Sequence, residues 1–120
     1  MKNGAGSAGQ IILVFERQHI VGFDLIQSLK DKGYSVVLES DFREVRPIIG
    51  ILKPDFIIAE SSAFQELLPA EEFETIKKSY HLTNESMLVH TKELEVLAVF
   101  EKPFNSDELV QFLNNHLNVI

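Results

Sequence analysis

Five short apolar runs, separated by segments of helical spacing, dominate this chain of 120 residues. The runs are residues 11–15, 34–38, 56–59, 86–89 and 96–100. Strands that are covered on both faces have short and nearly continuous apolar sequences of this kind. Because strands that alternate with helices pack as a doubly wound sheet, the pattern predicts an α/β domain.

The first intervening segment shows the helical spacing most clearly. Val21, Leu25 and Leu29 fall four positions apart, and Gly33 follows as a typical C-terminal cap. Further helical faces follow Asp41 (Val45, Ile48, Ile49, Leu52), Pro69 (Phe73, Ile76, Tyr80) and Asn105 (Leu109, Phe112, Leu113, Leu117). We therefore expect one domain over residues 11–120, preceded by a leader at residues 1–10.

The leader is rich in Gly, Ala and Ser, and residues 4–9 match the pattern G-x-G-x-x-G of dinucleotide-binding loops. In those loops the glycines follow a strand and open a helix, so that backbone amides meet a pyrophosphate. Here the pattern precedes the first strand. We therefore expect a flexible leader and no bound dinucleotide.

The charge balance limits the partners of the chain. Eighteen Asp and Glu against eleven Lys and Arg give a net charge of −7, which argues against direct binding to nucleic acid or to an anionic membrane. The longest apolar runs have five residues, whereas a membrane helix needs about 20. The chain has no cysteine, which excludes disulfides and thiolate metal sites and fits a reducing, cytoplasmic location.

The link between the fourth and fifth runs is unusually short. Residues 90–96 offer seven positions, too few for a packed crossover helix. An extended segment of that length reaches about 23 Å, which is enough to return beside a strand of about 17 Å. We therefore expect a five-stranded parallel sheet in the order 2-1-3-4-5, with the fourth helix shortened or missing.

Functional groups of a doubly wound sheet gather at the carboxyl ends of its strands. In this chain those ends carry Glu16 and Arg17, then Glu60, Thr91 and Lys102. The sequence here resembles the receiver domain of bacterial response regulators, on residues 12–17, on residues 53–60 and above all on residues 101–104, Glu-Lys-Pro-Phe. The resemblance extends over residues 11–117. It implies a flavodoxin-like fold and a place in two-component or phosphorelay signalling.

The chain departs from this family at the residues that carry its chemistry. Glu16 and Arg17 match the acidic pair that holds Mg²⁺, and Glu60 matches the phosphoacceptor Asp. The hydroxyl residue and the lysine of the family are kept as Thr91 and Lys102. The resemblance therefore implies an atypical receiver, or pseudo-receiver, without a phosphoacceptor and with neither a metal nor another cofactor.

Arg17 offers a physical reason for losing the metal, because a guanidinium adds positive charge where Mg²⁺ needs an anionic oxygen. We expect Arg17 to replace the metal by pairing with Glu60, Glu16 or both, with Lys102 as a second cation. The alternative is a solvated rim whose exposed pairs each contribute at most about 1 kcal/mol. Because adjacent cations keep both carboxylates ionised, they do not favour acid–base catalysis, and we expect no enzyme.

A missing fourth helix would leave apolar side chains of the fifth strand uncovered. Leu97, Val99 and Phe100, with Phe104 and Phe112 at the rim, form the predicted interaction surface. The alternative is that neighbouring helices move over to cover it.

Together these features predict a non-phosphorylated protein–protein interaction module. Its expected partner is a signalling protein (a kinase, an output domain or another regulator) or a second copy of the chain. Two alternatives remain open. One is a receiver-like domain with catalytic activity that is phosphorylated or uses a metal or flavin, and the other is a structural domain of a larger protein.

Overall fold

A computed structural model describes residues 10–17 and 19–117 of the chain. Its elements are β1 (Ile11–Phe15), α1 (His19–Asp31), β2 (Ser35–Glu39), the 3-10 helix η1 (Phe42–Glu44), α2 (Val45–Leu52), β3 (Phe56–Glu60), α3 (Ser61–Gln65), α4 (Ala70–Tyr80), β4 (Ser86–His90), β5 (Val96–Glu101) and α5 (Ser106–Leu117). The five strands coincide with the five apolar runs to within about two residues at each end. The short helix α3 was not predicted. The expected leader lies outside the described residues, except for Gln10.

The five strands form one sheet in the order β2-β1-β3-β4-β5, as expected. β1 pairs in parallel with β2 and with β3, but β4 is antiparallel to both of its neighbours. The prediction of a fully parallel sheet is therefore wrong. Because a parallel crossover needs a dozen or more residues, the short link after β4 closes an antiparallel hairpin instead.

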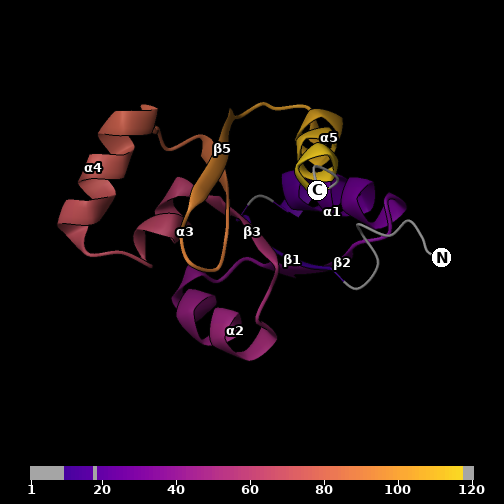
Figure 1. Cartoon of the computed structure of the whole chain (residues 1–120), viewed down its shortest axis with the longest axis horizontal. Coiled ribbons are helices and arrows are strands. Elements are labelled where there is room, and N and C mark those ends of the chain that lie inside the picture. Colours follow the sequence, from indigo (N-terminus) through magenta and orange to yellow (C-terminus); the bar gives the residue numbers. More distant parts are fainter. Residues whose placement is uncertain (1–9, 18, 118–120) are drawn as a thin grey trace.

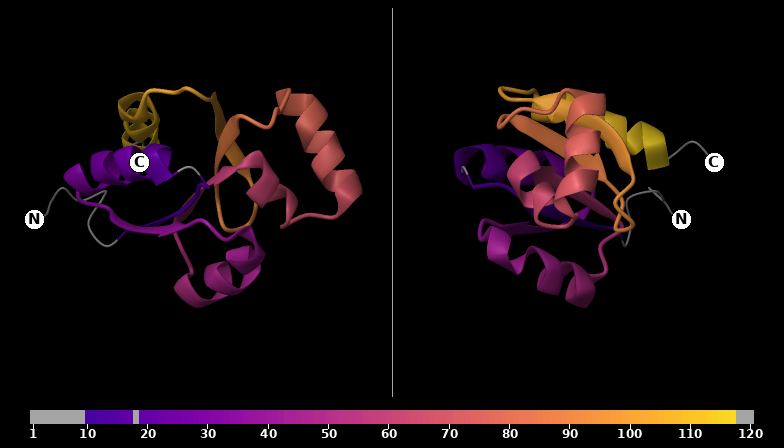
Figure 2. Two further views of the ribbon diagram at one scale, coloured as in Figure 1. Left: turned by 180° about the vertical axis from the view of Figure 1, so that it is seen from behind. Right: turned by 90° about the vertical axis from the view of Figure 1, so that its left-hand side faces the viewer.

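Helices cover both faces of this sheet (Figure 1). On one face α1 and α5 pack against each other, and α2 lies on the opposite face (Figure 2). Alternation along β1 explains the two layers, because successive side chains of a strand point to opposite faces. Ile12 and Val14 share a buried cluster with Leu25 and Leu109 of α1 and α5, whereas Leu13 belongs to the cluster of α2.

The helix α4 lies at one end of the molecule (Figure 1). It is largely exposed and packs mainly through Phe73, which shares a third buried cluster with Phe64 and Leu88. The half-buried Val96 and Val99 of β5 pack against this cluster. The α4 side of β5 is thus partly covered, although no helix lies between β4 and β5.

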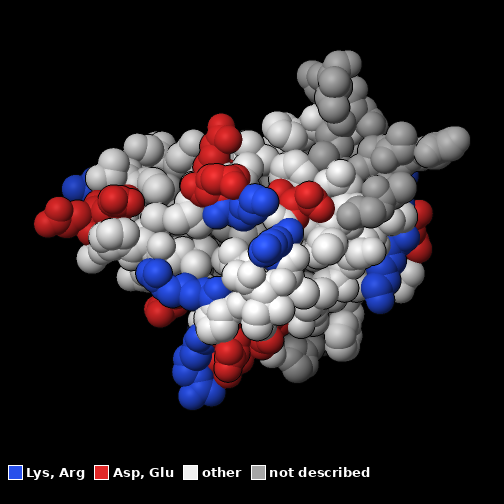
Figure 3. All heavy atoms as spheres, turned by 60° about the horizontal axis from the view of Figure 1, so that its bottom comes forward, with Lys and Arg blue, Asp and Glu red and all other residues white. Residues whose placement is uncertain are grey.

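The surface combines charges of both signs. In the face shown in Figure 3, basic side chains near the middle lie beside acidic ones, and further charges of both signs lie toward the ends of the molecule. Such intermingling leaves no extended basic stripe on this face. Among the described residues, no helix has both the length and the apolar character needed to cross a membrane.

Candidate functional site

The carboxyl ends of β1, β3 and β5 lie along one edge of the sheet, because these three strands run in the same direction. Glu16 and Arg17 follow β1, Glu60 ends β3, and Lys102 follows β5. Four of the predicted site residues are thereby brought to one place. Because β4 is antiparallel to both β3 and β5, β5 runs in the same direction as β3, as it would in a fully parallel sheet.

Lys102 occupies the centre of this cluster. Its Nζ donates hydrogen bonds to Glu16 Oε2 and to Glu60 Oε2, each at 3.0 Å, and lies 3.0 Å from Glu16 Oε1. The three side chains are nearly inaccessible to solvent, with exposed fractions of 7% for Lys102, 0% for Glu16 and 4% for Glu60. Because one ammonium contacts both carboxylates, it offsets the repulsion between them in a site that water does not screen.

The ionisation of the cluster follows from these contacts. Burial alone would raise the pKa of Glu60, but the Arg17 amide and the Lys102 ammonium outweigh it and hold the pKa below its usual range. Burial alone would lower the pKa of Lys102, but hydrogen bonds to both carboxylates raise it. At neutral pH Glu60 is therefore a carboxylate and Lys102 an ammonium, so Glu60 is not poised as a general acid and Lys102 is not a nucleophile.

Arg17 lies at the mouth of the cluster and contacts Glu60 in two ways. Its backbone N–H donates to Glu60 Oε1 at 2.8 Å, and its Nε lies 3.5 Å from the same oxygen. The side chain is 60% exposed, donates from Nη2 to Ser62 Oγ at 3.2 Å, and stacks its guanidinium 5.1 Å from the centre of the Phe42 ring. The expected bridge between the carboxylates is thus made by Lys102, and Arg17 contacts Glu60.

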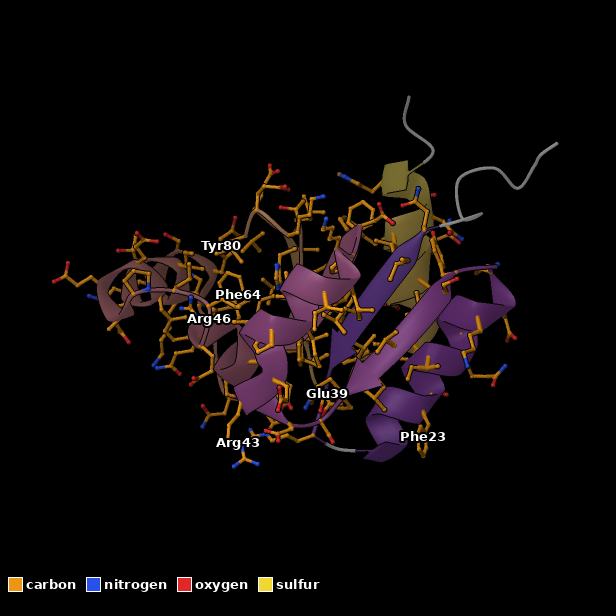
Figure 4. All side chains as sticks on the ribbon, turned by 90° about the horizontal axis from the view of Figure 1, so that it is seen from below. Phe23, Glu39, Arg43, Arg46, Phe64 and Tyr80 are labelled. Carbon is orange, nitrogen blue, oxygen red and sulfur yellow. The ribbon has the colours of Figure 1, made fainter. Side chains whose placement is uncertain are left out.

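Phe42 reaches Arg17 from the turn after β2. The Asp41 carboxylate accepts from the Arg43 amide at 3.0 Å and caps η1, and the Asp41 amide donates to Glu39 Oε2 at 2.8 Å. Figure 4 shows Glu39 at the end of β2 and Arg43 after it, with Arg43 directed away from the protein. The sequence indicated a helix after Asp41 but gave no sign that the following aromatic ring would support Arg17.

Thr91 does not belong to the cluster. Because β4 is antiparallel, its last residue, His90, pairs with Ile57 near the start of β3, whereas Glu60 pairs with Met87. Thr91 therefore lies at the opposite edge of the sheet, where its amide donates to the Glu95 carbonyl across the hairpin turn at 3.0 Å. Placing Thr91 with Glu60 was wrong, for the same reason that the parallel sheet was wrong.

Hydroxyl groups that the sequence analysis did not assign to this edge lie beside the cluster. Thr83 Oγ1 donates to Glu101 Oε1 at 2.8 Å, and the buried Ser86 Oγ contacts the other oxygen of that carboxylate. Ser61 Oγ donates to the Thr83 carbonyl at 2.7 Å. These bonds fix the loop between α4 and β4 against the end of β5, so they stabilise the strand that positions Lys102.

The five residues of the predicted interaction surface do not share one face. Leu97, Phe100, Phe104 and Phe112 pack against the cluster of α1 and α5, whereas Val99 packs on the α4 side. Phe100 lies 6.4 Å from Phe104 and 6.2 Å from Phe112 between ring centres, and all three are half-buried. The aromatic residues thus form a partly exposed cluster beside the outer edge of the sheet.

The donor set fits a divalent metal poorly. Mg²⁺ requires oxygen ligands in a near-octahedral arrangement, and here the two carboxylates face the Lys102 ammonium. Within the described residues, no group of three or more His, Cys, Asp or Glu side chains has the arrangement to hold a metal. A cation would have to displace Lys102 from both partners, so these residues do not suit the Mg²⁺ ion that receiver domains bind.

No protein-family model matches the chain, and no curated protein or solved structure shows significant similarity to it. The fold and the site define an α/β domain with a mixed five-stranded sheet and a buried ion-pair cluster at one edge.

Proposed function

We propose that this chain is a receiver-like interaction module of bacterial two-component or phosphorelay signalling that neither binds Mg²⁺ nor accepts a phosphoryl group. The observation that carries the proposal is the contact of one buried ammonium with both carboxylates. With Arg17 beside Glu60, two cations face two carboxylates, which supports a site whose charges are already balanced. The antiparallel β4 is a further departure from the receiver pattern, beyond those in the sequence.

The chemistry of Glu60 supports the same proposal. A phosphoryl group would add about −1.5 to −2 charges, whereas Glu60 carries −1 on a side chain one methylene longer than Asp. Because Lys102 already pairs with this charge, the cluster resembles a fixed state more than a switch. We therefore infer that partners recognise one standing conformation, in the cytoplasm, and that binding does not depend on phosphorylation.

The test is a titration with Mg²⁺ and beryllofluoride, an analogue of an acyl phosphate, followed by amide chemical shifts. We expect the amides of Arg17, Glu60 and Ser61 not to move. The double variant Arg17→Asp, Glu60→Asp is the matched positive control, because it restores an acidic pair and an Asp acceptor, and we expect its amides to shift with Mg²⁺. A saturable shift in the unaltered protein would reject the proposal and favour the catalytic alternative.

A further inference from the structure

We propose that the outer edge of β5 binds an extended apolar segment of a partner protein, flanked by lysine or arginine, which adds to the sheet as a sixth strand. This inference rests on the proposed role as an interaction module and names the kind of partner. Binding at the edge of β5 does not require that Glu60 be phosphorylated or remain unphosphorylated. An experiment can therefore reject either proposal without rejecting the other.

The first observation is that β5 ends the sheet. Within the part of the chain that the structure describes, it pairs with β4 and with no strand beyond. All five residues of β4 are buried, whereas Val96–Phe100 of β5 are each half-buried. At the register shift the consecutive residues Val89 and His90 pair with Ala98 and Val96, so Leu97 is an extra, bulged residue of β5 near the hairpin turn, and residues 98–101 keep a regular register. This stretch therefore has the straight geometry that an added strand requires.

The second observation is that residues 98–100 of β5 lack the usual protection of an edge strand, because the bulge at Leu97 affects only the part next to the hairpin turn. Natural edges carry lysine, proline or inward-pointing charges, which oppose pairing with another chain. Residues 96–100 contain none of these. Leu97 and Phe100 lie on the α5 side and Val99 on the α4 side, so an added strand would find partly exposed apolar side chains on both faces.

The third observation is the charge at both ends of the strand. Glu93 and Glu95 precede β5, and Glu85 and Glu101 lie at its other end, where the Glu85 carbonyl accepts from the Lys102 amide. All four acidic residues are exposed. Lys92 is an exposed cation at the turn, and Lys102 is already paired with Glu16 and Glu60. The charges around the strand therefore favour a segment with basic flanks.

The same charges oppose a second copy as the occupant. Only every second residue of β5 directs its backbone N–H and C=O away from β4. In an antiparallel pair of two β5 strands these residues must face each other, so the symmetry axis of the pair passes through one residue of each strand. Centring on Ala98 places Glu95 opposite Glu101, and centring on Val99 places the Glu101 carboxylate opposite Leu97. Two chains that each carry −7 also repel one another. A basic partner meets none of these penalties.

The experiment uses the full chain and a labelled peptide in which Val-Thr-Val-Thr-Val is flanked by two lysines at each end. Binding is followed by fluorescence anisotropy and by amide shifts. We expect the largest shifts in β5, and no binding by the same peptide methylated on alternate backbone nitrogens, because methylation removes the donors that pair with the strand. Replacing the peptide lysines with glutamates should also abolish binding.

Charge reversal on the protein supplies the matched controls. The variant Glu93→Lys, Glu95→Lys should weaken binding of the lysine-flanked peptide about tenfold, since a tenfold change needs only about 1.4 kcal/mol. The variant Glu44→Lys, Glu66→Lys makes the same change in net charge at exposed residues next to α2 and α3, and should leave the affinity unchanged.

Three results would overturn the inference: no shift of β5 amides at about 1 mM peptide, equal binding by the methylated peptide, or light scattering that shows dimers paired through β5. A beryllofluoride response together with peptide binding would reject the proposed function and leave the β5 edge as a docking site. No response to beryllofluoride together with no peptide binding would reject only the docking site.

Discussion

At the scale of single residues, burial decides which of two cations stabilises the carboxylates of the site more. Arg17 and Lys102 both lie beside Glu60, but the Arg17 side chain is 60% exposed and that of Lys102 only 7%. Sequence placed both at the correct edge. It ranked Arg17 before Lys102, and the structure reverses that order, because the ranking depends on which side chain enters the space between the carboxylates. The exposed pair is screened by water, and the buried one is not.

The variant Lys102→Met tests this ranking. It leaves Glu16 and Glu60 close together and buried without their shared ammonium, so we expect a loss of about 3–5 kcal/mol in the free energy of unfolding. The variant Arg17→Ala keeps the backbone N–H that donates to Glu60, and should cost less than about 1 kcal/mol. Denaturant unfolding followed by circular dichroism measures both.

A triple variant separates charge from packing in that result. Adding Glu16→Gln and Glu60→Gln to Lys102→Met removes the repulsion, so most of the lost stability should return. If the triple variant is no more stable than Lys102→Met alone, the cluster is held by packing of the lysine stem. If Arg17→Ala is the more damaging single change, Arg17 is the central cation after all.

At the scale of elements, the link after β4 decides the sheet. The turn ends at Leu94, whose φ of 72° lies in the left-handed region, and the Leu94 amide donates to the Thr91 carbonyl at 2.9 Å. Glycine or asparagine usually takes that position in a three-residue hairpin loop. Because leucine stands there, no residue of the link is typical of a hairpin turn, and the length of the link was the remaining evidence. Leu94 is half-buried and packs against the third cluster, which offsets part of the strain.

Among the described residues, Lys53 and His81 are non-glycine residues that end α2 and α4 in the left-handed conformation, and His81 gives a prediction at this scale. His81 ends α4 with a φ of 55°, and it is exposed, so its side chain contributes little packing. Replacing it with glycine removes a steric cost of about 1–2 kcal/mol, less about 0.4–1 kcal/mol for the freer unfolded chain. We expect His81→Gly to stabilise the protein by up to about 1 kcal/mol.

The matched control for this change is Ser79→Gly, two residues earlier and inside α4. The same new residue there should destabilise the protein by about 0.5–1 kcal/mol, because glycine weakens a helix interior. Thermal unfolding compares the two variants. Equal destabilisation by both would show that the left-handed conformation at His81 carries no cost.

At the scale of the whole molecule, much of the fold followed from the sequence and the direction of one strand did not. Continuous apolar runs fixed where the strands lie, and the strand order followed from the switch between β1 and β3. Glu16, Glu60 and Lys102 could be placed at one edge because β5 has the same direction in either sheet. Thr91 could not, since its position depends on β4 alone. The helix α3 has only five residues, too few for a periodic signal.

His90 gives a prediction for the molecule as a whole, because its ring lies fully buried in the core. Its Nδ1 lies 2.8 Å from the Thr91 carbonyl oxygen, which can only accept, so Nδ1 carries the proton. Within the described residues its Nε2 has no hydrogen-bond partner, and the ring packs edge-on against Phe64 at 4.8 Å between centres. Burial in this apolar site lowers the pKa of His90 to about 4 from a usual 6.5.

Folding stability should therefore fall as the pH drops from about 6.5 to about 4. In that window the unfolded chain protonates His90 and the folded protein does not, so acid favours the unfolded state by up to about 1.4 kcal/mol per pH unit, or about 3 kcal/mol in all. Glu60 adds to the loss once the pH falls below the usual pKa of a glutamate. There the unfolded chain takes up a proton at Glu60, whereas the folded protein, in which this pKa is lowered, does not yet do so. Denaturant midpoints measured across this range in His90→Gln should show a much flatter profile than the unaltered protein. A slope that survives in His90→Gln would show that the buried imidazole is not the group that acid titrates.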